Sequence, residues 1–391
     1  MNKLKQLEAC GQSVWLDYLT RSLIESGELC VLIERDGLKG VTSNPSIFEK
    51  AIGETDEYAD ALEQFQAYAD HNISEKIYEH LAIADIRAAA DVLRPVYDET
   101  HGRDGYISLE CSPYLANDFE ATASEARRLW AEVNRPNLMG KVPATPSGIP
   151  AIRQLTSDGL NINITLLFSV GVYEQVVDAY LSGLEDLSRA GGDISKIASV
   201  ASIFVSRIDT AIDKRLDKLR DKRAGLLRGK VGIANAKIAY ARYKELFSAP
   251  RWQVLAASGA KTQRLLWAST GVKDPAYKDT MYVEALVGRD SVDTIPPATM
   301  DSFRHHGTVT PDAIEQDVDS ARAVLTELEL LGVSLNEVTE KLVKEGVQKF
   351  ADAFDKLFDS IARRRDMLVE RKHSHQVIKP GSPEIRTAVD G

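Results

Sequence analysis

The sequence contains few cysteines, no long apolar run and no apolar leader. Its three cysteines, Cys10, Cys30 and Cys111, form no CxxC pair and no cysteine–histidine pattern with metal-ligand spacing. Structural thiols in a reducing compartment are therefore expected. No apolar run approaches the ~20 residues that span a bilayer, and the first residues, MNKLKQLEACGQSVWLDYL, contain no signal-peptide core. These absences predict a soluble, cytoplasmic protein with no membrane partner.

The sequence also has fewer basic than acidic residues. The chain has 48 Lys and Arg against 58 Asp and Glu, which gives a net charge of −10. This balance argues against general binding of nucleic acid or of an anionic membrane surface. A phosphorylated ligand would have to be held by a few local cations or by backbone N–H groups. The 391 residues, 44% of them hydrophobic, could form two or three average domains or one α/β barrel with insertions.

Common cofactor and metal motifs are missing as well. There is no GxGxxG after the first predicted strand, no HExxH and no EF-hand loop. The pair His305-His306 follows the last predicted strand, where a surface or packing role is expected. The sequence therefore predicts a protein without a metal ion or an organic cofactor.

Eight strand-like segments alternate with segments that have helical periodicity. The predicted strands are Val14–Leu19, Gly40–Asn44, Tyr106–Cys111, Asn137–Pro143, Asn161–Leu167, Ala198–Val205, Arg264–Thr270 and Ser291–Pro296. Predicted helices include Glu54–Asp70, Ser74–Thr100 and Ser169–Arg189. Strands that alternate with helices favour parallel βα units, and eight units close into a (β/α)₈ TIM barrel.

The chain is longer than one barrel requires. We expect the barrel at residues 1–309, with a helical insertion around residues 208–261. Within the insertion, the charged run Asp213–Arg223 is interpreted as a solvated helical face and Ala236–Phe247 as a second helix. Additional helices at residues 310–370 are expected to pack on the barrel through an apolar stripe, and residues 371–391 to form a flexible tail. The stripe consists of Val347, Phe350, Phe354, Phe358 and Ile361.

Polar residues recur on one face of several predicted strands. Because strand side chains alternate, Asn161, Asn163 and Thr165 share a face, opposite the apolar Ile162, Ile164 and Leu166. The apolar face is expected to meet the helices, which directs the polar side chains into the barrel. The other inward candidates are Asp17, Thr42 with Asn44, Ser108 with Glu110, and Ser202 with Phe204. Such a lining is suited to a polyhydroxylated substrate, although each polar group alone could be a satisfied core residue.

Lys141 is the leading candidate nucleophile. It lies near the end of the strand-like run Asn137–Pro143, where an ammonium must either extend to solvent or be desolvated. Desolvation disfavours the charged form of a lysine, and a neutral amine can attack a carbonyl. We therefore expect Lys141 to form a Schiff base.

Several segments together resemble the transaldolase family. They are Gly40-Val41-Thr42-Ser43-Asn44-Pro45-Ser46, Asn161-Ile162-Asn163-Ile164-Thr165-Leu166-Leu167-Phe168-Ser169, Ser202-Ile203-Phe204-Val205-Ser206-Arg207, Leu266-Trp267-Ala268-Ser269-Thr270 and the strand that carries Lys141. The resemblance spans roughly Asp17 to Pro297, and the length is closer to the long bacterial branch. It implies a class I aldolase barrel of the pentose phosphate pathway. Such an enzyme moves a dihydroxyacetone unit from sedoheptulose 7-phosphate to glyceraldehyde 3-phosphate, giving erythrose 4-phosphate and fructose 6-phosphate.

The resemblance also implies roles for individual residues. Lys141 resembles the Schiff-base lysine, Glu110 and Thr165 the pair that moves protons through a water, and Asp17 the acid/base at the substrate hydroxyl. The groups that resemble the dihydroxyacetone site are Thr42, Asn44, Asn163, Ser202 and Phe204. At the phosphate end, Arg207 and Ser269 match the family pattern. The second arginine of the shorter branch is missing, and Lys273 is expected to replace it.

Two alternatives remain at this point. An aldolase on the same barrel, such as fructose-6-phosphate aldolase, would release free dihydroxyacetone. A catalytically inactive barrel would bind a sugar phosphate as a sensor or scaffold. The retention of Asp17, Glu110 and Lys141 favours an active transferase. The sequence leaves the oligomeric state open between a monomer and a homodimer.

Overall fold

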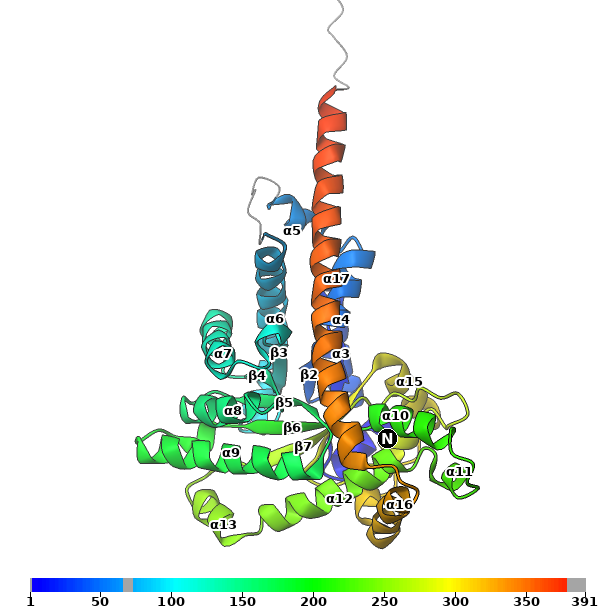
Figure 1. Cartoon of the computed structure of the whole chain (residues 1–391). Helices are drawn as coiled ribbons and strands as arrows, with labels where there is room; N and C mark the ends of the chain where they lie inside the picture. The colour runs from blue at the N-terminus through cyan, green and yellow to red at the C-terminus, as the bar shows by residue number, and fades with distance from the viewer. Residues whose placement is uncertain (1, 66–72, 378–391) are drawn as a thin grey trace, which may run out of the picture.

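A computed structural model describes residues 2–65 and 73–377 of the chain (Figure 1). Eight parallel strands close into one barrel in chain order, and β1 pairs with β8. The strands are β1 (Ser13–Asp17), β2 (Gly40–Thr42), β3 (Tyr106–Glu110), β4 (Leu138–Pro143), β5 (Ile162–Leu167), β6 (Ser199–Phe204), β7 (Gln263–Ala268) and β8 (Val292–Ile295). This arrangement confirms the predicted (β/α)₈ barrel, with strand boundaries shifted by at most two residues.

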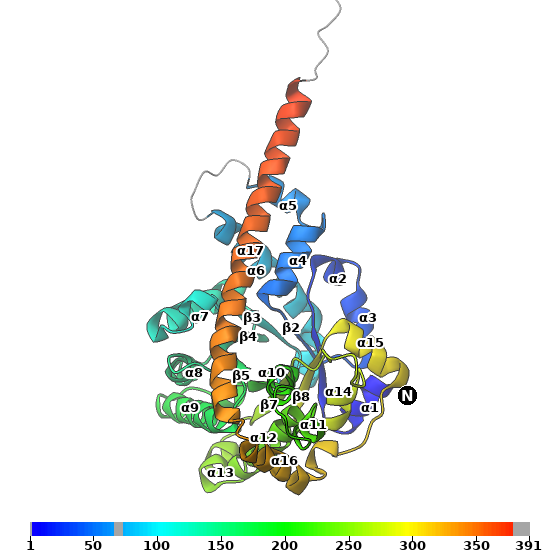
Figure 2. The same ribbon diagram turned by 45° about the vertical axis from the view of Figure 1, so that its right-hand side comes forward.

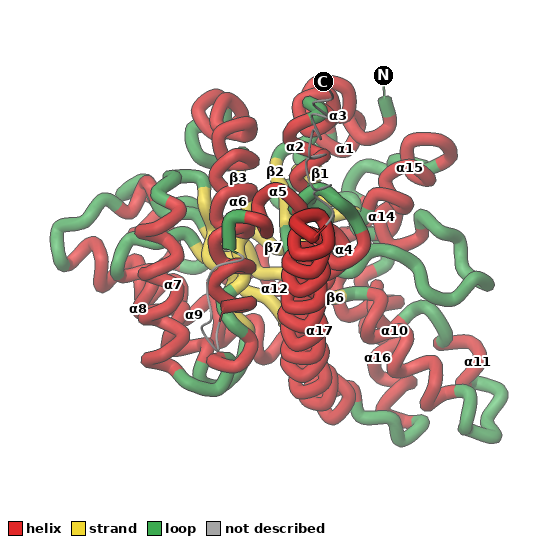
Figure 3. Tube along the Cα trace, turned by 90° about the horizontal axis from the view of Figure 1, so that it is seen from above, coloured by secondary structure: helices red, strands yellow, loops and turns green. Residues whose placement is uncertain are grey.

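Helices surround this barrel on its outer side (Figures 1 and 3). They are α1 (Lys3–Ala9), α2 (Arg21–Glu25), α3 (Glu28–Asp36), α4 (Pro45–Glu54), α5 (Ala59–Glu63), α6 (Ile73–Glu99), α7 (Phe119–Val133), α8 (Gly148–Ser157), α9 (Val170–Arg189), α10 (Ser206–Leu216), α11 (Ala224–Leu227), α12 (Val231–Leu246), α13 (Pro250–Ala257), α14 (Met281–Ala285), α15 (Pro297–His306), α16 (Val318–Leu330) and α17 (Leu335–Val377). Short 3₁₀ helices lie at Pro113–Leu115, Ile194–Lys196 and Ala313–Glu315. No helix in the described part of the chain is both long enough and apolar enough to cross a membrane.

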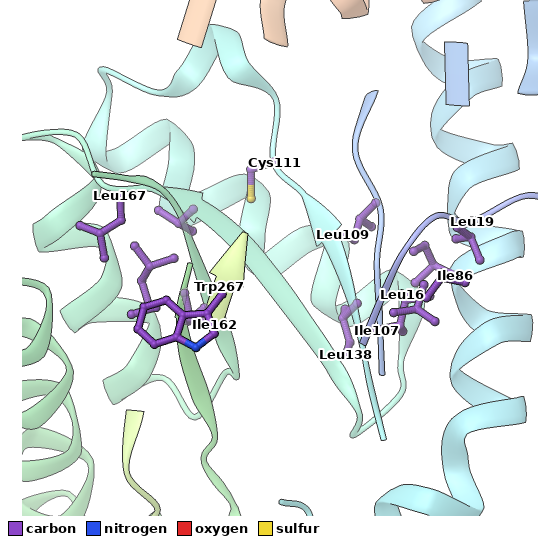
Figure 4. Packing of buried hydrophobic residues seen from close by; sticks show 14 of the residues in the cluster. Leu16, Leu19, Ile86, Ile107, Leu109, Cys111, Leu138, Ile162, Leu167 and Trp267 are labelled. Carbon is purple, nitrogen blue, oxygen red and sulfur yellow. The ribbon is translucent and has the colours of Figure 1, made fainter. Parts of the chain in front are cut away.

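The outward side chains of the strands form the main core with the surrounding helices. Figure 4 shows Leu16 and Leu19 from the β1 region close to Ile86 of α6, all three nearly inaccessible to solvent. Ile107 and Leu109 of β3 also point away from the barrel axis. Each buried aliphatic side chain of this kind contributes about 1.5–3 kcal/mol relative to exposure. This outer layer fixes the strands that carry the inward polar residues.

Large side chains close the barrel interior at the end where the strands begin. Trp15, Tyr106 and Met139 fill it, and each is fully buried. Gly40 of β2 is required here, because a Cβ at this position would lie 2.5 Å from the Trp15 ring. The lower half of the barrel is therefore closed, and any ligand must enter from the opposite end.

Helix α17 differs from the predicted C-terminal extension in its length. It continues as one helix from Leu335 to Val377 and packs against α4, α6 and α10 (Figures 1 and 2). The predicted apolar stripe does dock: Phe354 contacts Tyr78 of α6 edge-on, with ring centroids 5.2 Å apart. The helix continues through residues 371–377, which were expected to begin the flexible tail. Residues 378–391 lie outside the described part of the chain.

Three local predictions were wrong. The helix predicted at Glu54–Asp70 does not form as one unit, because Thr55 is extended and ends α4, and α5 is a separate short helix; residues 66–72 of that span lie outside the described part. The run Asp213–Arg223 is not one solvated helix. Helix α10 ends at Leu216, and buried Asp213 accepts hydrogen bonds from Gly229 N and Tyr277 Oη.

The third error concerns Leu166 on β5. Alternation placed it on the outer face, but its φ of 54° lies in the left-handed region, where the β5–β6 register shifts. Its side chain instead meets α17, because a Cβ at Gly346 would lie only 2.7 Å from it. A bulky residue in this conformation is an outlier, and it lies at the mouth of the barrel. The close approach of α17 therefore depends on Gly346 and on this turn of β5.

Candidate active site

The register of the strands brings the predicted polar residues together at one end of the barrel. Paired positions in a parallel sheet share a face, and Lys141 pairs with Glu110 on β3 and with Asn163 on β5. Asp17 of β1 similarly pairs with Thr42 of β2. These positions lie at or near the carboxyl ends of their strands, where barrel enzymes bind their substrates.

A cavity of about 260 Å³ opens at this end. All of the predicted site residues except Glu110 line it: Asp17, Thr42, Asn44, Lys141, Asn163, Thr165, Ser202, Phe204, Arg207, Ser269 and Lys273. Further lining residues, which the sequence reasoning missed, are Ser46, Leu266, Ala268, Gly271, Thr294, Pro296 and Phe350. The cavity is therefore polar at its base and carries two cations towards its rim.

Lys141 is held in a buried environment by two acceptors. Its Nζ donates to the carbonyl oxygen of Ser43 at 3.1 Å and lies 3.4 Å from Glu110 Oε2. The Lys141 and Glu110 side chains are only 8% and 5% exposed. These two contacts hold the amine of Lys141 at the wall of the cavity. The 3.4 Å separation from Glu110 is long for an ion pair, and the amine can still reach a ligand in the cavity.

Two carboxyl groups flank the lysine, and burial changes the chemistry of both. Burial raises the pKa of Glu110 above its ordinary value, and the positive charge of Lys141 opposes this rise only in part. Burial likewise raises the pKa of Asp17, against the charge of Lys141 and a hydrogen bond from Thr42 Oγ1 of 2.9 Å. A carboxyl group with a raised pKa can take and return protons nearer neutral pH.

Glu110 lies behind Lys141 rather than in the lining of the cavity. On its other side it borders a second space of about 20 Å³, together with Tyr78 and Glu125. Burial raises the pKa of Glu125 to about 7. Glu110 thus separates the large cavity from a small space next to α6 and α7.

Amide and hydroxyl groups form a chain across the base of the cavity. Asn163 Nδ2 donates to Ser108 Oγ at 2.9 Å, and Ser202 Oγ donates to Asn163 Oδ1 at 2.6 Å. The buried Thr165 hydroxyl, in contrast, has no hydrogen-bond partner within residues 2–65 and 73–377. Buried hydroxyls are almost always paired, so the Thr165 hydroxyl is available to a ligand or a water. The two hydrogen bonds therefore fix the orientation of the Asn163 amide, whereas the Thr165 hydroxyl can still donate to a ligand.

Arg207 and Lys273 form the cationic rim of the cavity. The Arg207 guanidinium lies over the rings of Phe204 and Phe350, at 4.8 and 5.9 Å from their centroids. It forms no ion pair with any residue that the structure describes. Lys273 Nζ is folded back towards the cavity, 3.8 Å from where a Cβ on Gly271 would lie. Both cations can therefore accept an anionic group such as phosphate.

Ser269 and Phe350 complete the rim. Ser269 has a φ of 58°, and its hydroxyl lies 2.9 Å from that of Ser206 at the start of α10. Strained residues of this kind cluster at functional sites. Phe350 comes from α17, which the sequence predicted only as a packing helix. The apolar stripe identifies Phe350 as a buried residue, but its pattern does not distinguish a residue of the site from one that only packs.

No group of three or more His, Cys, Asp or Glu side chains in the described residues has an arrangement that could hold a metal ion. The three cysteines, in the same part of the chain, are free thiols.

Comparison with known proteins gives the same family that the motifs resemble. The sequence model described as Transaldolase/Fructose-6-phosphate aldolase matches residues 14–361. A protein named Transaldolase from Thermobifida fusca is 49% identical over 362 residues, which are 92% of this chain and 98% of the relative. Transaldolase 2 from Streptomyces coelicolor is 48% identical, covering 91% of this chain and 95% of the relative. Transaldolase from Trichodesmium erythraeum is 46% identical, covering 93% and 97%.

Proposed function

This chain belongs to the transaldolase family, and from that premise we propose how its barrel carries out the transaldolase reaction. The reaction moves a dihydroxyacetone unit from sedoheptulose 7-phosphate to glyceraldehyde 3-phosphate and gives erythrose 4-phosphate and fructose 6-phosphate. One observation supports the assignment of the site most strongly. A buried lysine amine lies at the wall of a polar cavity, beside one buried carboxyl group and electrostatically coupled to a second.

In the first step Lys141 Nζ attacks the ketose carbonyl carbon, and the carbinolamine loses water to form an iminium. We assign the proton transfers of this step to Glu110, 3.4 Å from Nζ, and to Thr165, whose hydroxyl has no partner among the described residues. The raised pKa of Glu110 supports the role, because a carboxyl group that is partly protonated can act as an acid and then as a base. The iminium then withdraws electrons from the neighbouring carbon, without the need for a metal.

Asp17 accepts the proton of the substrate hydroxyl, and the adjacent C–C bond breaks. The electron pair moves into the iminium, erythrose 4-phosphate leaves, and an enamine remains on Lys141. The hydrogen bond from Thr42 keeps the Asp17 carboxyl directed into the cavity. The same Asp17 returns its proton when the enamine attacks the aldehyde of glyceraldehyde 3-phosphate and a new C–C bond forms.

A transferase must keep the three-carbon unit bound until the acceptor arrives. The fixed chain of Ser108, Asn163 and Ser202, with Asn44 and Thr42 opposite, offers hydrogen bonds to its hydroxyl groups. Phe204 and Phe350 also line the cavity, and their apolar rings are proposed to limit the access of water. Arg207, Lys273 and Ser269, which all line the cavity, are proposed to hold the phosphate of the donor or acceptor.

We also propose that the enzyme works in the cytoplasm as a monomer or a homodimer, with sugar phosphates and no nucleic acid as ligands. The acidic net charge and the three free thiols support this setting.

Product analysis tests the transferase function against simple aldol cleavage. The enzyme is incubated with fructose 6-phosphate, with and without erythrose 4-phosphate, and the products are separated. We expect sedoheptulose 7-phosphate and glyceraldehyde 3-phosphate only when the acceptor is present, with little free dihydroxyacetone in either case. Release of free dihydroxyacetone at the same rate without acceptor would instead indicate the aldolase alternative.

A further inference from the structure

A second, strongly cationic groove lies beside the active site, between α10 and the first half of α17. The two helices run next to one another in both Figure 1 and Figure 3. The groove encloses about 530 Å³, within the range of sites that bind small molecules. Its floor is apolar, formed by Ala211, Val338 and Leu342.

Seven cationic side chains line this groove, and Glu345 is its one acidic lining residue. Helix α10 supplies Arg207, Lys214 and Arg215, which recur on one helical face, and Lys218 follows two residues after the end of the helix. Helix α17 supplies Lys341 and Lys349, and Lys273 comes from the loop after β7. Such a concentration of positive charge is unexpected on a chain whose net charge is −10.

The cations of the groove are also mostly unpaired. Lys341 lies 3.5 Å from Glu345. Within residues 2–65 and 73–377, the other six cations form no ion pair. Elsewhere on the surface, exposed arginines are paired more than once: Arg128 with Glu79 and Glu132, and Arg251 with Asp178 and Glu185.

This arrangement costs stability without a compensating contact inside the chain. Lys214 and Arg215 are adjacent in the last turn of α10, and Lys218 follows two residues after its end, so like charges that repel one another are concentrated in one short segment. The cations of α10 also face those of α17 across the groove. A bound anion with several charges would reverse that repulsion and form charge-assisted hydrogen bonds with several side chains at once.

The groove is continuous with the active site. Arg207 and Lys273 line both cavities, so the two cations at the rim of the catalytic cavity are also the inner end of the groove. A positively charged channel of this kind attracts phosphorylated molecules towards the site against the repulsion of an acidic protein. Its volume exceeds what one phosphate group needs.

We propose that the groove between α10 and α17 is a binding site, adjoining the catalytic cavity, for a small polyanion that carries two or more phosphate groups. The site extends outward from the phosphate end of the catalytic cavity, and its occupant contacts Lys214, Lys218 and Lys349 in addition to the shared rim. It does not depend on the proposed reaction, because binding can be measured without turnover.

Inorganic pyrophosphate is the probe, and isothermal titration calorimetry at low salt measures its affinity. The test variant replaces Lys214, Lys218 and Lys349 by Gln and leaves Arg207 and Lys273 intact. The matched control replaces Lys222, Lys344 and Lys356 by Gln. These three are exposed lysines on α17 or just after α10, and they lie outside the groove. Both variants change the net charge equally, and circular dichroism and thermal melting verify that each is folded.

We expect the unaltered chain and the control variant to bind one pyrophosphate with equal affinity, and the groove variant to bind at least about tenfold more weakly, since several charge-assisted contacts are lost. Orthophosphate should bind the unaltered chain more weakly than pyrophosphate. Equal pyrophosphate affinity of all three proteins would overturn the proposal, since the shared rim alone would then explain binding. No binding to the unaltered chain, or equal affinity for orthophosphate, would also overturn it. A groove that binds pyrophosphate in a chain without transferase activity would support this site and reject only the proposed function.

Discussion

The two ends of one barrel each contain a buried pair of opposite charges, and the two pairs differ in how completely they are satisfied. Near the start of the strands, Arg264 lies 2.9 Å from Asp104, and both are almost fully buried. Near the ends of the strands, Lys141 lies 3.4 Å from Glu110, equally buried. Burial is the same at both ends, so burial alone does not distinguish a structural charge from a reactive one.

The pair at the closed end has a complete set of partners. Ser13 Oγ donates to Asp104 Oδ2, Trp15 Nε1 donates to Oδ1, and Arg264 also donates to Ser13. The pair at the open end has a longer contact. Its lysine lines a cavity together with Thr165, whose hydroxyl has no hydrogen-bond partner among the described residues. A saturated network fixes a core, whereas an incomplete one leaves groups available to a substrate.

The largest effect is expected for Lys141→Met. Without the amine no iminium can form, so transaldolase activity should fall to background. Stability should fall less than when a fully ionised buried pair is broken, because burial already raises the pKa of Glu110, and the carboxyl group can become protonated once the ammonium is gone. Activity assays and urea unfolding measure the two results. Activity near that of the unaltered enzyme would show that the buried lysine at the open end is not the reactive group.

Glu110→Gln keeps the shape of the side chain and removes its proton exchange. A positioned acid/base contributes roughly 10²–10⁴-fold to a rate, so kcat should fall by about that factor, with KM changed much less. Stopped-flow measurement of Schiff-base formation should show that this step slows. If C–C cleavage alone were to slow, the proposed role of Glu110 would be wrong.

Arg264→Met breaks the pair at the closed end. It leaves Asp104 buried without its cation, which typically destabilises a protein by about 3–5 kcal/mol. We expect a lower urea midpoint, while kcat per folded molecule stays close to normal because the site at the other end is intact. Loss of kcat without loss of stability would show that the Arg264–Asp104 pair has a catalytic role and not a structural one. Lys222→Met, an exposed lysine in the segment after α10, serves as the control for removing a cation.

Asp293→Asn tests a third buried charge, on the outer face of β8, through pH. Burial raises the pKa of Asp293 to about 8, and the nearby Thr270 hydroxyl offsets little of this rise. A carboxyl group with a raised pKa in the folded state contributes its full stability below its unfolded pKa, near 4, and loses it as the pH rises to about 8. The Asn variant should therefore gain stability over the unaltered chain by up to about 1.4 kcal/mol per pH unit in this window. Urea unfolding at several pH values measures this. A difference in unfolding free energy between the two proteins that stays constant from pH 4 to pH 8 would contradict the prediction.

The eight strands could be predicted because alternation and apolar content identify a strand from local sequence alone. The inward residues followed from the same alternation as long as the backbone stayed regular. Leu166 was misplaced for that reason, since its left-handed φ interrupts the alternation, and no local pattern indicates it. The prediction of Glu54–Asp70 failed because an extended Thr55 is compatible with a helical pattern on both sides.

Long-range contacts were the part that the sequence could not supply. The stripe on α17 predicted packing, but only the tertiary structure places Phe350 over Arg207 and the cavity. The cations of the groove are far apart in the chain and become neighbours only when α10 and α17 lie side by side. The Lys141–Glu110 pairing required the register of β3 and β4, which the order of the strands allows but does not determine.

The central claim is that the loosely paired lysine at the open end is the one that reacts. Borohydride reduction in the presence of fructose 6-phosphate, followed by peptide mass spectrometry, tests it most directly. We predict a covalent three-carbon adduct on Lys141, and none on the neighbouring cation Lys273 or in the Lys141→Met variant. An adduct on another lysine, or none in the unaltered enzyme under turnover conditions, would contradict the account.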